Sequence, residues 1–198
     1  MPRHLQQIWD TCGNVLAGGF PYSEGIYEDL NKAITLQHCW DDRDALDTLR
    51  EYAAGVTSPE VAEELVQAVL LLEAQHDHSP TQLPVGEELR NQLYPTNGGE
   101  SECVIMNLPK VAGAAQCDQM MLDIEQRLTK AARGAWRWRL LRLRAQIDAE
   151  AARTGGRMSE ALDEMLEVLV TIYSAQNAEW SVCPQSRQSI LRLQGVNK

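Results

Sequence analysis

The sequence has no long hydrophobic run and no leader-like start. Its longest uninterrupted apolar run is Ala68–Leu72, whereas a membrane-spanning helix needs about 20 apolar residues. The N-terminal segment contains Asp10, Asn14 and the pair Gly18-Gly19, unlike the apolar core of a signal peptide. We therefore expect a cytoplasmic protein that makes no contact with membranes.

Paired cysteine motifs and the common catalytic signatures are also missing. The five cysteines are odd in number and show no CxxC spacing, so we expect reduced, mostly buried thiols rather than disulfides or a zinc site. There is no P-loop, no GxGxxG or GxSxG motif and no DxDxDG calcium loop. These absences favour a non-enzymatic protein without a cofactor. The cysteines are Cys12, Cys39, Cys103, Cys117 and Cys183.

Acidic residues are missing from one segment of an otherwise acidic chain. The formal net charge is -10, yet no Asp or Glu lies between Glu125 and Asp148. Outside residues 127–144 the chain has 11 Lys and Arg against 28 Asp and Glu. Such segregation of charge concerns the choice of partners rather than the fold. The basic residues of this segment are Arg127, Lys130, Arg133, Arg137, Arg139, Arg142 and Arg144.

Apolar residues recur at helical spacing along almost the whole chain. The pattern predicts an all-α protein, a helical bundle of seven to eight helices. Only residues 103–108 have the composition of a strand, and we expect an extended connector there because one strand makes no sheet. The predicted helices cover residues 5–16, 23–34, 41–55, 57–76, 87–93, 114–153 and 159–180, with a last one from 184.

Local signals mark several of these helix ends. Thr57 and Glu60 have the spacing of a capping box, and Ser159 is in place to cap the following helix. Gly155-Gly156 is expected to end the long basic helix, in which Gly134 is the weak point.

The chain has one internal similarity. Residues 58–75 align with residues 159–176 without gaps. This predicts an N-terminal helical half at 1–94, a connector at 95–110 and a C-terminal half at 111–198. The alternative is a single domain over 1–198, since any two capped amphipathic helices resemble each other.

The basic segment has aromatic residues on two faces. On a helix, Trp136 falls in one sector with Leu140 and Leu143, whereas Trp138 points to nearly the opposite side. Such a helix either lies beneath another element, with its arginines paired to acidic faces of its neighbours, or it exposes an aromatic and guanidinium surface.

The favoured prediction is a non-enzymatic helical adaptor, assembly subunit or inhibitor. Its basic helix would dock an anionic or amphipathic protein partner or a second copy of the chain. The helix at 57–76 adds a second apolar surface, because its second half is apolar almost all round. A nucleic-acid-binding subunit is an alternative, with Trp138 stacking on bases. The predicted partner-binding residues are Leu70, Leu71, Arg133, Trp136, Arg137, Trp138, Arg139, Arg142 and Arg144.

A second alternative is a metal-dependent hydrolase. The stretch EMLEVLVTIY at 164–173 resembles the ExxD helix of MazG-like all-α nucleotide pyrophosphatases, and EVAEE at 60–64 resembles their first acidic helix. Glu167 stands where that family has Asp. The resemblance implies a Mg²⁺-dependent nucleotide hydrolase using Glu60, Glu63, Glu164 and Glu167.

Glu73 and His76 form an ExxH pair, which is the spacing found in dimetal helical bundles. No second ExxH is present to complete such a centre. We therefore expect a Glu73–His76 hydrogen bond near the helix end in preference to a metal site.

Overall fold

The computed structural model describes residues 1–19, 28–76 and 109–177. These residues form eight α-helices and a short 3-10 helix, with no strand among them, which confirms the all-α prediction. The predicted elements at 87–93, at 103–108 and from 184 onward lie outside the described residues. The helices are α1 (Pro2–Cys12), η1 (Gly13–Val15), α2 (Glu28–Trp40), α3 (Ala45–Val56), α4 (Ala62–Gln75), α6 (Val111–Arg127), α7 (Lys130–Gly134), α8 (Trp136–Thr154) and α9 (Glu160–Asn177).

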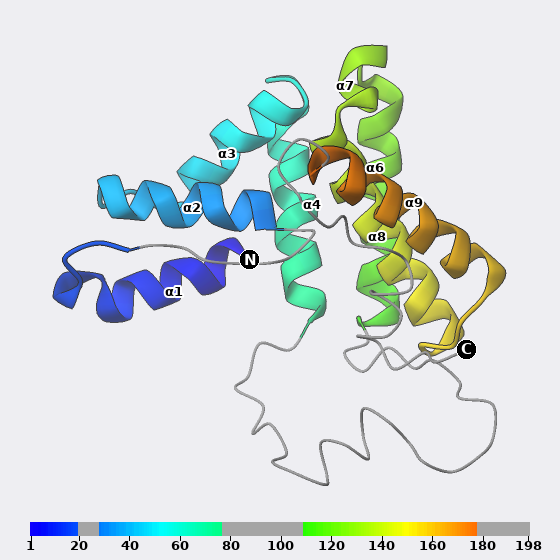
Figure 1. Ribbon diagram of the computed structural model, residues 1–198, viewed down its shortest axis with the longest axis horizontal. Coiled ribbons are helices and arrows are strands. Elements are labelled where there is room, and N and C mark those ends of the chain that lie inside the picture. The colour runs from blue at the N-terminus through cyan, green and yellow to red at the C-terminus, as the bar shows by residue number, and fades with distance from the viewer. Residues whose placement is uncertain (20–27, 77–108, 178–198) are drawn as a thin grey trace, which may run out of the picture.

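The long helices α4, α6 and α8 form the middle of the molecule. In Figure 1 they lie beside one another, α9 crosses α8, and α1, α2 and α3 extend to the left. The closest pairings are α6 with α8, α4 with α6, and α8 with α9. Within the described ranges, no helix has the length and hydrophobicity needed to span a membrane.

Several helix ends follow the local signals. Ser159 Oγ accepts a hydrogen bond from the Leu162 N–H at 3.2 Å, so it caps α9 as predicted. Gly155 ends α8 in the left-handed conformation at φ 62°, which only glycine adopts without strain. The helix predicted at 41–55 starts later, since Asp44 caps α3 and its carboxylate accepts from the Leu46 N–H at 2.7 Å.

The predicted capping box of α4 is wrong. The Thr57 hydroxyl donates to the Ala53 carbonyl at 2.7 Å, at the end of the preceding helix. α4 itself starts at Ala62 and has no side-chain cap. Thr57 therefore completes α3, because its hydroxyl and its own backbone N–H both donate to the Ala53 carbonyl.

The predicted continuous helix at 114–153 is also wrong, because it is broken twice. Thr129 accepts a hydrogen bond from the Ala132 N–H and starts the short α7. Ala135 is extended, with ψ 132°, directly after Gly134. The break therefore falls next to the glycine that the sequence marks as weak, and α7 and α8 become separate helices.

Helix α8 lies between two hydrophobic clusters. Trp138 and Ala145 belong to the larger cluster, together with residues of α2, α3, α4 and α6. On its other face, Leu140 and Leu143 pack against α9, with Trp136 beside them. This confirms the two opposed faces expected for the segment and makes α8 a central helix.

The larger cluster draws residues from both predicted halves, since it runs from Leu30 to Ala145. Most of the predicted connector at 95–110 lies outside the described part of the chain. The division into two halves therefore stays a prediction.

Replacing Trp138 by Ala is expected to lower the free energy of unfolding by about 3–5 kcal/mol, because the indole is fully buried. The matched control is Trp40→Ala, at a side chain that is 88% exposed, with an expected change within about 0.5 kcal/mol. Urea unfolding followed by circular dichroism measures both. Equal losses in the two variants would contradict the central position of α8.

Candidate functional site

A pocket of about 290 Å³ lies where α8 meets α1, α2, α3 and α4. We call it the α8 pocket. Its walls are mainly apolar side chains from α2, α4 and α8, and polar groups stand among them. The apolar wall consists of Leu30, Val69, Leu72, Leu140, Leu141 and the ring of Trp136.

An arginine of α8 and an aspartate of α2 form one polar edge of the pocket. Arg137 donates to Asp29 through Nε at 2.7 Å and through Nη2 at 3.2 Å. The Tyr52 hydroxyl donates to the same carboxylate at 2.8 Å. Burial and the Asp29 carboxylate raise the pKa of Tyr52 well above its usual range, so the phenol stays protonated as the donor. The guanidinium also lies 4.4 Å from the ring centre of Trp136, a cation–π contact.

A second polar cluster joins α4 to α8. His76 Nε2 lies 2.9 Å from Asp148 Oδ2 and 2.8 Å from Arg144 Nη2, while Arg144 Nε donates to Asp148 Oδ1 at 2.9 Å. Asp148 is buried, so its charge requires these partners. The guanidinium can only donate and the carboxylate can only accept, so His76 Nε2, which either donates or accepts, satisfies one of them at a time.

The predicted Glu73–His76 hydrogen bond is not formed. The Glu73 carboxylate accepts from the backbone N–H groups of Arg3 at 3.1 Å and His4 at 2.9 Å. It therefore caps the N-terminal end of α1, where the helix dipole favours a negative charge. His76 contacts Asp148 instead. Glu73 therefore joins α4 to α1, and Asp148 joins α8 to the end of α4.

Two further arginines of the basic segment bind other helices. Arg142 is buried and pairs with Asp118 and Glu125 of α6. Arg127 donates to Glu64 at 2.9 Å, near the start of α4. Arg142 thus joins α8 to α6, and Arg137 joins α8 to α2. Arg127 joins the end of α6 to α4.

The predicted partner-binding residues differ in burial: some are buried, some line the α8 pocket and two are exposed. Trp138, Arg142 and Leu70 are buried, and Leu71 packs against the larger cluster, so none of these four forms an open docking surface. The sequence predicted these residues on the surface because it does not show which neighbouring helices cover α4 and α8 on both sides. Trp136, Arg137 and Arg144 line the α8 pocket.

Arg133 and Arg139 remain on the surface, and no ion pair connects either of them to another described residue. They are the predicted basic residues that stay available to an outside group.

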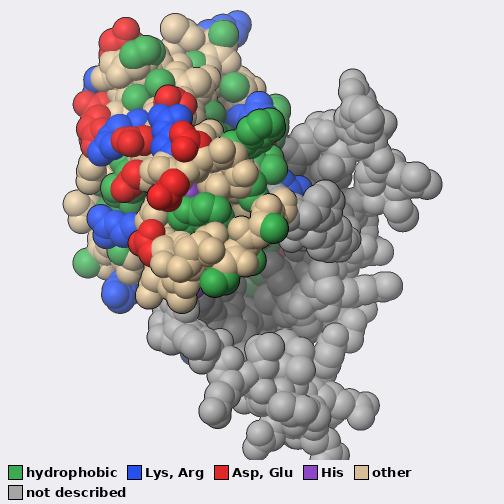
Figure 2. All heavy atoms as spheres, turned by 90° about the vertical axis from the view of Figure 1, so that its left-hand side faces the viewer, with side chains coloured by type: hydrophobic (Ala, Val, Ile, Leu, Met, Phe, Trp, Pro, Cys, Tyr) green, Lys and Arg blue, Asp and Glu red, His purple; other side chains and the backbone are tan. Residues whose placement is uncertain are grey.

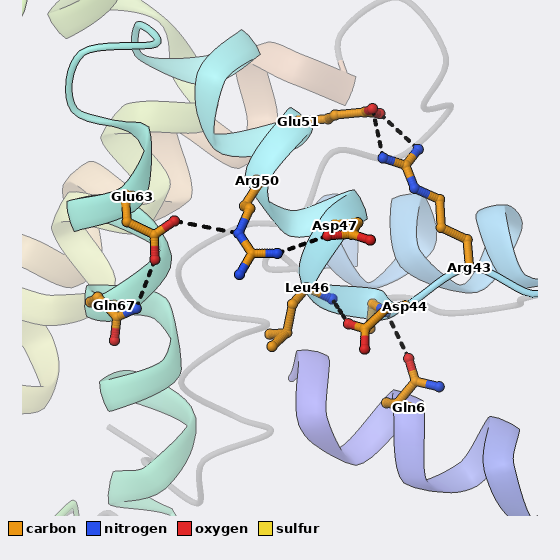
Figure 3. A network of polar contacts seen from close by, with 10 residues as sticks. Gln6, Arg43, Asp44, Leu46, Asp47, Arg50, Glu51, Glu63 and Gln67 are labelled. Carbon is orange, nitrogen blue, oxygen red and sulfur yellow. Dashed lines mark hydrogen bonds and ion pairs between the residues drawn. The ribbon is translucent and has the colours of Figure 1, made fainter.

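The four carboxylates of the hydrolase alternative do not come together. Figure 3 shows Glu63 held by Arg50 at 3.4 Å and by Gln67 at 2.9 Å. Glu164 and Glu167 are exposed on α9. Within residues 1–19, 28–76 and 109–177, no group of three or more metal-binding side chains is found.

Sequence reasoning missed Asp29, Tyr52 and Asp148 as parts of the site. Asp148 lies one helical turn after Arg144, so this pair had a visible signal in the i, i+4 spacing. Asp29 and Tyr52 had none, since Arg137 lies 108 residues away from Asp29.

Comparison of the chain with known protein families, with curated protein sequences and with solved structures finds no match.

Replacing Asp148 by Asn is expected to lower the free energy of unfolding by about 2–4 kcal/mol, because Arg144 and His76 lose their shared anion. The control is Asp123→Asn, an exposed carboxylate on α6 that accepts only from Gln119 among the described contacts. Urea denaturation measures both variants. A loss no larger in the Asp148 variant than in the control would show that the cluster does not hold α4 to α8.

Proposed function

We propose that this protein is a helical adaptor or assembly subunit that binds an amphipathic segment of another protein. The segment places one or two large apolar side chains in the α8 pocket and acidic side chains beside the arginines of α7 and α8. The observation that supports this most directly is the apolar pocket built on the same residues, Trp136, Arg137 and Arg144, that the sequence marks for partner binding.

The size of the pocket favours side chains over a large cofactor. Ligand sites for whole small molecules hold about 300–1,000 Å³, and the α8 pocket lies at the lower limit with about 290 Å³. Binding energy in protein interfaces is concentrated in a few anchors that fill such pockets. An apolar anchor fits the walls formed by Leu72, Leu140 and Leu141.

Arginines in the pocket lining and on the same stretch of chain favour an acidic partner, although Asp29 and Glu73 also line the pocket. Arg137 uses Nε and Nη2 for Asp29, and its half-exposed guanidinium keeps further N–H groups that can donate. Arg133 and Arg139 add exposed positive charge on the same stretch of chain. These groups supply attraction to carboxylates and orient the segment, while the apolar wall supplies the affinity.

The two other functions have less support. A Mg²⁺-dependent hydrolase requires carboxylates that converge on one ion, whereas Glu63 is held by Arg50 and Gln67. Binding of nucleic acid depends on many arginines free for phosphates, and Arg127 and Arg142 are held by carboxylates of the chain itself.

Photo-crosslinking in cells that naturally make the protein tests the proposal. The residue p-benzoylphenylalanine replaces Trp136 in the pocket or, as a control, Val111, which is exposed on α6. We expect one recurrent partner from position 136, cross-linked through an amphipathic segment rich in Asp and Glu. Adding Leu141→Phe, which narrows the pocket, should remove this product, and urea unfolding verifies that the variant still folds.

Three outcomes would contradict the proposal. The first is that positions 136 and 111 would give the same products, and the second is that the cross-link from position 136 would stay within the chain. The third is that the partner would still be cross-linked in the Leu141→Phe variant.

A further inference from the structure

The far end of α1, η1 and α2 exposes several large apolar side chains. Most of the exposed large hydrophobic side chains in the described residues belong to these elements or follow η1 directly. Trp40 is 88% exposed and Val15 is 77% exposed. We call this end the α1–α2 tip, and its exposed apolar residues are Ile8, Val15, Leu16, Leu36 and Trp40.

Specific contacts join the elements that carry these side chains. The ring of Trp9 stacks on His38 with centroids 5.0 Å apart, and its Nε1 donates to Asp42 at 3.0 Å. A side chain at Gly13 would come within 2.8 Å of the Trp9 ring, so this position needs glycine. Gln6 Oε1 accepts from the Ala45 N–H at 2.7 Å and joins α1 to α3 (Figure 3). Helices α1 and α2 are therefore held to each other and to α3 by side-chain contacts at this end.

Several carboxylates lie at the tip. Burial lowers the pKa of His38, and the carboxylates of Asp10, Asp42 and Asp44 act against this shift, which places these three groups around one imidazole. Asp41 is exposed directly after Trp40.

The nearest arginine does not offset this charge. Arg43 is held by Glu51 through two hydrogen bonds, at 2.6 and 3.0 Å. Figure 2 looks onto this end of the molecule and shows acidic and basic side chains gathered near exposed apolar ones.

We propose that the α1–α2 tip is a second docking surface, which binds a basic amphipathic helix of a partner protein. Leu36 and Trp40 lie one turn apart on the same face of α2, so they can accept the apolar side of such a helix. The carboxylates of Asp10, Asp41 and Asp42 attract its Lys and Arg residues. An anionic membrane is repelled by the same carboxylates. This surface is separate from the α8 pocket, and its charge has the opposite sign.

Binding of a designed peptide tests this inference. The probe is a fluorescent amphipathic helix of Leu and Lys, and its control has Glu at every Lys position. Fluorescence anisotropy should show binding of the Lys peptide that weakens with salt, and binding of the Glu peptide at least tenfold weaker.

Variants of the full chain locate the site of binding. Trp40→Ser and Asp41→Lys should each weaken binding of the Lys peptide at least tenfold, whereas Val111→Ser, at an exposed residue outside the tip, should leave it unchanged. Both tip residues are exposed, and a Lys after the end of α2 suits the helix dipole, so the fold is kept. Circular dichroism and urea unfolding verify this.

Several results would overturn the inference. These are a Lys peptide that fails to bind, equal binding of the Lys peptide to the Trp40→Ser variant, and equal binding of the Lys and Glu peptides. Trp40-dependent binding to vesicles of anionic phospholipid, or a Trp40-dependent dimer in light scattering, would assign the surface to a membrane or to a second copy. Loss of the partner that is cross-linked at position 136 leaves this inference intact, because the two surfaces are tested separately.

Discussion

The structure depends on how a strongly basic helix is buried. α8 packs against α6 on one side and α9 on the other, so its arginines cannot all reach water. Charges removed from water need opposite charges and hydrogen bonds at close range. Asp118 and Glu125 of α6 supply them for the buried Arg142, and Asp148 of α8 itself does so for the partly buried Arg144. The half-exposed Arg137 pairs with Asp29 of α2. Some of the acidic residues that outnumber the basic ones in this chain therefore form ion pairs within the fold.

The burial of α8 limits how the basic segment can bind a partner. A flat surface of arginine and tryptophan would suit many anions, whereas α8 offers an apolar pocket with Arg137 and Arg144 in its lining. The proposed adaptor then has two surfaces of different character. In these proposals the pocket binds an acidic amphipathic segment, and the α1–α2 tip, where the exposed Trp40 precedes Asp41 and Asp42, binds a basic one.

The sequence predicts what local interactions decide. Helical spacing, the Ser159 cap and the end of α8 at Gly155 follow from neighbouring residues, and the structure has all three. The site depends on tertiary contacts, which no local pattern contains. The two faces of the basic helix are visible in the sequence, but it does not say that both are covered. The bond from Arg137 to Asp29 joins residues 108 positions apart, and the choice of Glu73 to cap α1 is equally non-local.

The central claim is that the paired arginines of α8, above all the buried Arg142, hold the fold together, and a double-mutant cycle tests it most directly. The cycle combines Arg142→Met with Asp118→Asn, and the free energy of unfolding is measured for both single variants and the double variant. The account predicts a coupling energy of about 1–3 kcal/mol for this pair and close to zero when Arg139→Met, at an exposed position, replaces Arg142→Met. A coupling near zero for Arg142 and Asp118, with little loss from Arg142→Met alone, would contradict it.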